Sequence, residues 1–223
     1  MPVIVAIDGP SGAGKSTVAK MLASRLDVPY IDTGAMYRAV GVAARERGIG
    51  LPITDAANVE RLAESLAIEL ETFGKEVRVF VNGREVTAAI REPEVSRYAS
   101  AVSAVPGVRR RLVALQRRLA AERGAVLEGR DIGTKVFPGT PHKFFLTASP
   151  QVRARRRATE LASRGTPQSY EDVLAEMERR DRDDQTRKDS PLTHDETYVV
   201  VDSTDRTIED VVSEIERRVH GSG

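Results

Sequence analysis

The 223-residue sequence contains no cysteine, which excludes disulfide bonds and thiolate metal sites and is typical of a reducing cytosol. It has no apolar run approaching the ~18 residues of a membrane-spanning helix. Its formal net charge is only +1, so no overall field favours nucleic acid or a membrane as a partner. The three histidines are scattered, without metal-ligand spacing. These absences predict a cytoplasmic protein that binds neither nucleic acid nor a membrane.

Charge is nevertheless abundant and has an uneven chemistry. Charged residues make up 30% of the chain, and 28 of the 34 basic residues are arginine. A guanidinium group pairs with phosphate or carboxylate through two parallel hydrogen bonds, which a lysine cannot do. Genome composition produces the same bias, so the arginine content favours phosphate recognition only where motifs support it.

Apolar strand patterns alternate with amphipathic helix patterns along most of the chain. This alternation predicts an α/β fold with a five-stranded, mostly parallel core sheet flanked by helices and joined by right-handed crossovers. The length suits one such domain with insertions. The predicted core strands cover residues 3–7, 28–31, 125–127, 143–146 and 198–201.

Residues 55–90 interrupt this alternation. After a short helical pattern, apolar residues alternate with polar ones at 68–70 and 77–81, and Asn82-Gly83 is the preferred pair for a type I′ turn. The segment predicts an inserted subdomain with a small antiparallel sheet.

Residues 151–190 are densely charged and contain few apolar anchors. A segment that buries so little is a candidate for a short, mobile helical lid over a site. The alternative is a pair of exposed helices that do not move, because charge alone is no sign of motion.

The segment GPSGAGKST at 9–17 matches the phosphate-loop pattern GxxxxGK[ST], and it follows a strand and opens a helix as that mechanism requires. Its backbone N–H groups and the helix N-terminus form an anion cradle. Lys15 is expected to reach the β- and γ-phosphates of ATP, and the Ser16 hydroxyl to bind Mg²⁺. The predicted nucleotide-binding residues are Gly9, Pro10, Ser11, Gly12, Ala13, Gly14, Lys15, Ser16 and Thr17.

A phosphate loop serves nucleotide switches, motors and small-molecule kinases. The NKxD motif of guanine-specific switches is absent, and the chain is short for a motor, which favours a kinase. A kinase acting on an alcohol needs a general base, whereas one acting on a monophosphate needs cations that bring two anions together. The arginine-bearing motifs 32–38 (DTGAMYR), 128–134 (EGRDIGT) and 180–187 (RDxxDxxR) favour a monophosphate, since the first two follow strands near the phosphate loop.

Together with GPSGAGKST and the run from Glu128 to Pro138, these motifs resemble bacterial cytidylate kinases over essentially the whole chain. The resemblance implies a phosphate-loop NTPase fold, a monomer, and Mg²⁺-dependent transfer of the ATP γ-phosphoryl group to CMP or dCMP. It also implies a core (1–33, 106–150 and 191–223), a CMP-binding subdomain (34–105, containing the 55–90 insert) and a lid (151–190).

The resemblance further implies residue roles. Asp131 belongs to the set that reads cytosine, and a carboxylate suits that role because it accepts a hydrogen bond from the exocyclic amine. Ser100 belongs to the same base-reading set, and the nearby Ser96 and Ser103 are alternatives for its role. The resemblance assigns the acceptor phosphate to Thr33, Arg38, Arg130 and Arg187, the ribose to Arg180 and Asp184, and the base to Ser100, Arg109 and Asp131. The predicted catalytic residues are Lys15, Arg38, Arg130, Arg187 and Arg157, the last of these from the helical spacing of the lid arginines.

Several alternatives stay open. Arg130 and Asp131 could pair with each other, and Asp181 is expected to pair with an arginine. Any of Arg153, Arg156 and Arg157 could cover the transferring group or lie in water. The rival functions are another small-molecule kinase acting on UMP, AMP or a shikimate-like alcohol, with Asp32 as the base, and a nucleotide switch.

Overall fold

The computed structural model describes residues 2–73 and 76–221. The chain forms two compact units. Unit 1 comprises Met1–Tyr30 and Arg123–Gly223, and unit 2 comprises Ile31–Glu122. The two units are described separately below.

A five-stranded parallel sheet confirms the predicted core. Its order is β2-β6-β1-β7-β8, with β1 at the centre. The register places Asp8 opposite Gly129 and Phe145, so β1, β6 and β7 end at the same edge. Burial on both faces explains the continuous apolar runs, as in β1, where Val5, Ala6 and Ile7 are inaccessible. The strands are β1 (Ile4–Asp8), β2 (Tyr30–Asp32), β6 (Ala125–Gly129), β7 (His142–Thr147) and β8 (Val199–Asp202).

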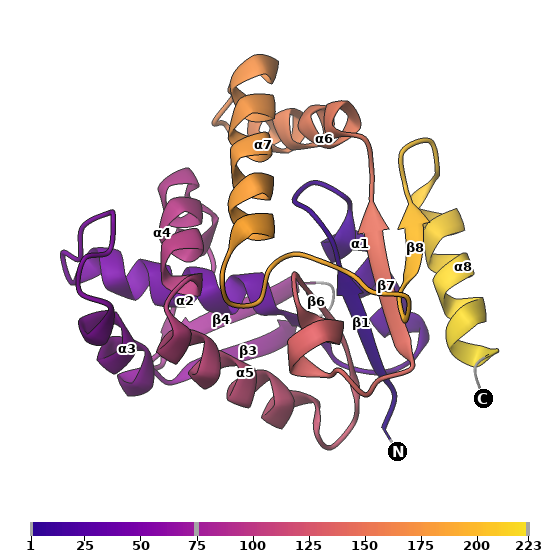
Figure 1. Ribbon diagram of the computed structural model, residues 1–223, viewed down its shortest axis with the longest axis horizontal. Coiled ribbons are helices and arrows are strands. Elements are labelled where there is room, and N and C mark those ends of the chain that lie inside the picture. The colour runs from indigo at the N-terminus through magenta and orange to yellow at the C-terminus, as the bar shows by residue number, and fades with distance from the viewer. Residues whose placement is uncertain (1, 74–75, 222–223) are drawn as a thin grey trace. The chain divides into compact units, whose positions relative to one another are not determined.

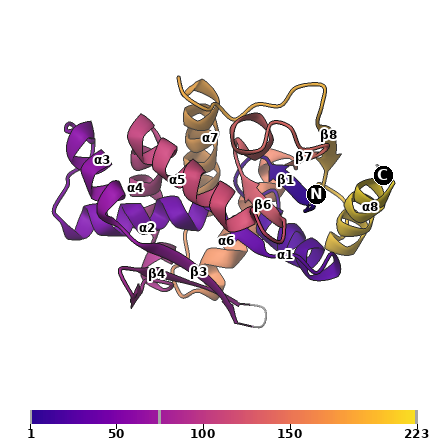
Figure 2. The same ribbon diagram turned by 90° about the horizontal axis from the view of Figure 1, so that it is seen from below.

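Two helices of unit 1 cover one face of this sheet (Figures 1 and 2). They are α1 (Lys15–Arg25), which packs on β6, and α8 (Ile208–His220), which packs on β7 and on α1. Thr207 caps α8 by accepting a hydrogen bond from the Asp210 amide at 3.1 Å. A π-helical turn, η2 (Ile132–Val136), follows β6 and contacts β1.

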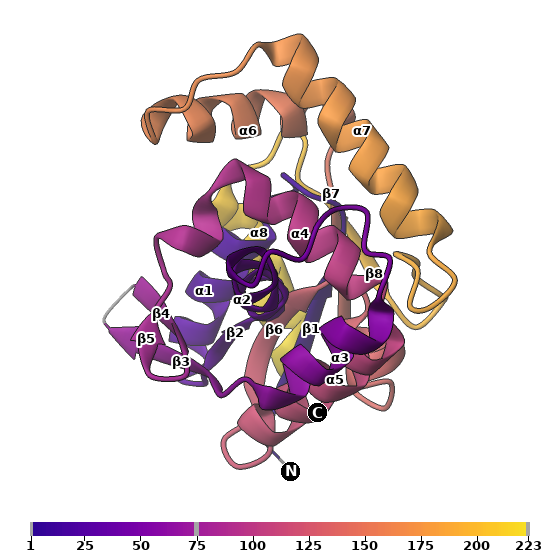
Figure 3. The same ribbon diagram turned by 90° about the vertical axis from the view of Figure 1, so that its left-hand side faces the viewer.

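The predicted lid forms two helices, α6 (Pro150–Ser163) and α7 (Tyr170–Thr186), which meet at a steep angle (Figure 3). They share a small apolar core of Ala154, Leu161, Val173 and Met177. Pro150 at the first position and Ser149 as the cap begin α6 directly after β7.

Unit 2 is built around α2 (Thr33–Glu46), which packs closely on α4 (Pro93–Ser103). A side chain at Gly41 would lie 3.0 Å from Cβ of Tyr98, so glycine permits this approach. No element is predicted for α4 from the sequence, although Val95, Tyr98, Ala99 and Val102 form a helical stripe. The remaining helices are α3 (Ala56–Ser65), η1 (Ala89–Arg91) and α5 (Pro106–Ala120). α5 packs on α3, and both helices lie in unit 2.

The predicted antiparallel sheet is present in unit 2. It consists of β3 (Ile68–Phe73), β4 (Glu76–Val81) and β5 (Arg84–Glu85), in that order. Asn82 and Gly83 join β4 to β5 with φ values of 51° and 76°, the positive angles that a type I′ turn requires. The Asn82 side chain also accepts the Ala67 amide at 2.8 Å.

Candidate active site

The phosphate loop begins where β1 ends. Gly9 has φ 145°, and a side chain there would lie 2.0 Å from the Leu146 carbonyl oxygen of β7. Gly12 has φ 75° and lies against Met177 of α7. Gly14, with φ 92°, stands at the start of α1. These positions need glycine, and they bring the loop to the positive end of α1, where an anion is stabilised.

Lys15 is the first residue of α1 and is buried, with 6% of its surface exposed. Its Nζ donates to the Pro10 carbonyl oxygen at 2.7 Å. Burial lowers the pKa of Lys15 below its usual value, and the positive charges of Arg130 and Arg180 lower it further. A phosphate beside Nζ would raise this pKa again and supply the counter-charge.

A cavity of about 440 Å³ opens beside the loop within unit 1. Its lining comes from the phosphate loop, the first half of α6, the loop after β8 and the start of α8. Its volume falls within the range of small-molecule sites. The polar and charged side chains in its lining are Lys15, Ser16, Thr17, Arg156, Arg157, Glu160, Ser203, Arg206 and Thr207.

A cluster of arginines surrounds one carboxylate in unit 1. Arg130 donates through Nε to Oδ2 of Asp184 at 2.8 Å, and Arg187 pairs with Oδ1 of the same residue. Burial alone would raise the pKa of Asp184, but Arg130, Arg180 and Arg187 hold it below its usual value. Glu128 and Asp181 also act on Arg130, so the cluster contains negative as well as positive groups, and Asp184 is the carboxylate that binds two of its arginines directly.

The loop that carries Arg130 and Asp131 is held by Asp8, the last residue of β1. The two oxygens of Asp8 accept the amides of Ile132 and Gly133, each at 2.9 Å. Asp131 is buried. Arg130 forms a salt bridge with Asp184 at 2.8 Å.

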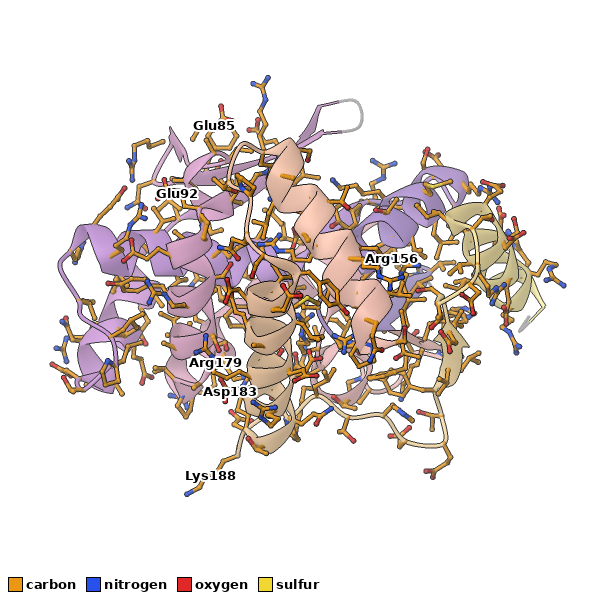
Figure 4. The ribbon with its side chains drawn as sticks, turned by 90° about the horizontal axis from the view of Figure 1, so that it is seen from above. Glu85, Glu92, Arg156, Arg179, Asp183 and Lys188 are labelled. Atoms are coloured by element: carbon orange, nitrogen blue, oxygen red, sulfur yellow. The ribbon has the colours of Figure 1, made fainter. Side chains whose placement is uncertain are left out.

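The three lid arginines have different surroundings. Arg153 is buried and donates to the carbonyl oxygens of Ala148 and Ser11 and to Asp181, confirming that Asp181 pairs with an arginine. Arg156, labelled on α6 in Figure 4, donates to the carbonyl oxygen and hydroxyl of Ser203. Arg157 pairs only with Glu160 among the contacts described, and it lines the cavity.

Four of the predicted residues lie in unit 2, in two groups. Asp32 caps α2 through the Ala35 amide at 2.7 Å and pairs with Arg38 at 3.0 Å, next to the buried Thr33. At the start of α5, Arg109 is buried and donates to the Ser103 carbonyl oxygen at 3.2 Å.

The second group links to α2 and to the serines of α4. Arg109 lies over the ring of Tyr37, with 5.4 Å between guanidinium carbon and ring centroid. Ser103 donates through its hydroxyl to the Ser100 carbonyl oxygen at 2.8 Å. Within unit 2, Arg109 therefore contacts Ser103, and Ser103 contacts Ser100 one helical turn earlier.

Some site residues are not singled out by the sequence. Tyr37, which Arg109 contacts, is one of them, although it lies inside the predicted motif 32–38. Ser203 and Arg206 line the cavity from the loop after β8, and no motif marks them.

Within residues 2–73 and 76–221, no cluster of His, Asp or Glu could hold a metal ion by itself. In the same residues, no helix is long and apolar enough to span a membrane.

Comparison with known proteins gives consistent matches. A family model described as Cytidylate kinase matches residues 5–221. The chain is 48% identical to a cytidylate kinase of Geobacter sp. (strain M21), over 97% of this chain and 92% of that protein. It is also 48% identical to a cytidylate kinase of Pelotomaculum thermopropionicum, over 96% and 95%. An uncharacterized protein from Eubacterium ventriosum shares the fold, with a TM-score of 0.55 at 13% identity and 98% coverage of both chains.

Proposed function

The chain belongs to the cytidylate kinase family, and from that premise we propose a role for each part of its site. As a cytidylate kinase, it is a nucleoside monophosphate kinase that transfers the γ-phosphoryl group of ATP to CMP or dCMP. The observation that carries the proposal is the concentration of Lys15, Arg130, Arg180 and Arg187 in unit 1, where Asp184 binds Arg130 and Arg187 directly. Phosphoryl transfer between two anions requires such fixed cations.

The donor ATP occupies the phosphate loop, residues 9–17, in this proposal. The loop amides and Lys15 hold its phosphates, and the cavity beside them takes the rest of the nucleotide. The depressed pKa of Lys15 supports this role, because the bound phosphates would restore the charge that burial disfavours.

The acceptor phosphate, the ribose and the base each have their own proposed residues. Thr33, Arg38, Arg130 and Arg187 hold the acceptor phosphate, and Arg180 and Asp184 contact the ribose. Both oxygens of Asp184 already accept from arginines, but each carboxylate oxygen has a second lone pair for a ribose hydroxyl. Ser100, Arg109 and Asp131 read the base, and the Arg109–Ser103–Ser100 contacts support the first two of these roles.

Mg²⁺ is proposed as the cofactor. Ser16 lies at the second position of α1, is exposed and lines the cavity, so its hydroxyl fits a metal that takes most ligands from phosphates and water. When bound, Mg²⁺ neutralises charge that develops on the β- and γ-phosphate oxygens.

We also propose that residues 151–190 act as a lid and 34–105 as the CMP-binding subdomain, on the core 1–33, 106–150 and 191–223. Arg157 would cover the transferring group, since its half-exposed pair with Glu160 is weak and easily exchanged. The enzyme is proposed to be a monomer with no nucleic-acid partner. It is proposed to work in the cytoplasm, where ATP and CMP are available. Light scattering of the purified protein checks the monomer.

A coupled assay of ADP formation tests the function. Purified protein with ATP and Mg²⁺ is given CMP, dCMP, UMP, AMP or shikimate in separate reactions. We expect turnover with CMP and dCMP to exceed turnover with UMP and AMP by orders of magnitude. Strong turnover with shikimate alone would favour the alcohol-kinase alternative, and slow hydrolysis that ignores every acceptor would favour a nucleotide switch.

A further inference from the structure

Asp8 is a buried carboxylate to which the proposed function gives no part. It ends the central strand β1 and directly precedes Gly9 of the phosphate loop. Taking a carboxylate out of water is costly, and burial raises the pKa of Asp8 to about 6 despite three hydrogen bonds that lower it. A residue that served packing alone would not need this charge.

The partners of Asp8 indicate what it does. Oδ1 accepts the Ile132 amide and Oδ2 accepts the Gly133 amide, both at 2.9 Å. These are the two residues that follow Arg130 and Asp131. Asp8 therefore ties the start of the donor loop to the loop that carries an acceptor arginine and the base-reading carboxylate.

Tyr198, the residue before β8, completes the arrangement. Its hydroxyl donates to Oδ2 of Asp8 at 2.7 Å, and its ring packs edge-on against Phe145. A side chain at Gly133 would lie 2.6 Å from the Tyr198 hydroxyl oxygen, so the tyrosine also limits where the loop can go. The Nζ atom of Lys143 lies over the Tyr198 ring, 5.9 Å from its centroid, and bounds that face of the ring.

The backbone of Asp131 is held from the opposite direction as well. Its carbonyl oxygen accepts the Lys135 amide at 2.8 Å and the Val136 amide at 3.3 Å within η2. Both groups of the peptide that follows the Asp131 Cα are therefore hydrogen-bonded: the carbonyl oxygen of Asp131 and the amide of Ile132. A shift of η2 would carry the Asp131 carboxylate with it.

We propose that Asp8 and Tyr198 are positioning residues that lock the Arg130–Asp131 loop onto the end of β1 and thereby set the discrimination between cytosine and uracil. This inference rests on the proposed function, because it concerns the base-reading role of Asp131. Neither residue touches the nucleotide in this account. They act through the amides of Ile132 and Gly133 and the bulk of the tyrosine ring.

The sharp variant is Tyr198→Phe, which removes one hydroxyl and keeps the ring. We measure kcat/KM for CMP and for UMP, KM for ATP, and Tm. We expect the CMP-to-UMP ratio to fall by about tenfold, the effect of one lost hydrogen bond, with KM for ATP unchanged. The ratio does not depend on how much enzyme is folded, so a purely structural role would leave it unmoved.

Tyr98→Phe is the control, because its part-buried hydroxyl also makes one hydrogen bond, to the Ile49 carbonyl oxygen at 2.9 Å. It should keep the wild-type ratio even where Tm falls. Asp8→Asn, which replaces an acceptor oxygen with a donor, should lower the ratio further. If Tyr198→Phe keeps the wild-type ratio, the inference is wrong. If the wild-type protein itself does not use CMP, the proposed function is wrong instead.

Discussion

The Nε atom of Arg130 lies 2.8 Å from Oδ2 of Asp184, although 54 residues separate them in the chain. Arg130 follows β6, and Asp184 stands near the end of α7 beside its other partner, Arg187. One buried carboxylate therefore orients two guanidinium groups that the proposed function assigns to the same phosphate. It also ties α7 to the carboxyl edge of the sheet.

This arrangement predicts a pH-dependent loss of stability in Asp184→Asn. Arginines hold the pKa of Asp184 below its unfolded value of 3.8, so its stabilisation is complete above that value and is lost as pH falls through the folded pKa. We expect the variant to lose about 3 kcal/mol of unfolding free energy at pH 7. The difference from wild type should shrink in more acidic solution.

Urea denaturation at pH 7 and at several values below pH 4 measures the effect. Asp183→Asn is the matched control, since Asp183 is exposed on the outer face of α7 beside Arg179 (Figure 4). It should leave stability nearly unchanged at each pH. A deficit in Asp184→Asn that stays constant across this range would contradict the role of the ionised carboxylate.

The second prediction concerns Asp131→Ala. Cytosine presents a donor where uracil presents an acceptor, so losing the carboxylate removes a favourable contact with one base and a repulsive one with the other. We expect kcat/KM for CMP to fall on the order of 100-fold and that for UMP to fall much less. Steady-state assays with both substrates measure this, with Asp183→Ala as control. Equal losses would show that Asp131 does not read the base.

Much of the fold was predictable because its signals are local. The core strands are continuous apolar runs, and Asn82-Gly83 has one preferred turn geometry. The stripe of Val95, Tyr98, Ala99 and Val102 is also a local signal for a helix. It lies among polar residues directly after the insert, and the sequence analysis predicts no element there. The grouping of α5 with unit 2 depends on packing against α3, which no local pattern encodes.

The site was predictable where motifs carry it and not where partners come from distant segments. Arg153, Arg156 and Arg157 look equivalent in sequence, three and four residues apart on a helix. The structure distinguishes them through Ser11, Asp181, Ser203 and Glu160, which other parts of the fold supply. The Tyr198–Asp8 contact joins residues 190 positions apart, and no spacing rule identifies it.

The third prediction concerns the metal. If the Ser16 hydroxyl binds Mg²⁺, Ser16→Ala should raise the free Mg²⁺ concentration for half-maximal rate by about tenfold or more, because water replaces a protein ligand. Chelation with EDTA should abolish turnover in both proteins. Rates titrated against free Mg²⁺ measure the shift, and Ser24→Ala, exposed on the same helix, is the control. An unchanged Mg²⁺ dependence in Ser16→Ala would remove the hydroxyl from the metal site.

The fourth prediction separates the lid arginines. Arg157 makes a half-exposed pair with Glu160, worth about 0.5 kcal/mol or less, so Arg157→Ala should leave Tm nearly unchanged. If it covers the transferring group, kcat should fall about 1,000-fold. Arg153 is buried on three acceptors, so Arg153→Ala should cost roughly 3 kcal/mol of stability.

Arg155→Ala, an exposed position on the same helix, is the control for both and should change neither kcat nor Tm. Tm and kcat are measured on all three variants. A loss of kcat indicates a role in transfer, and a loss of Tm indicates a structural role. If Arg157→Ala keeps the wild-type kcat, no role in covering the phosphoryl group remains for it. Because Arg153 already pairs with Ser11 and Asp181 and Arg156 with Ser203, the transfer would then depend on Lys15, Arg38 and the arginines around Asp184.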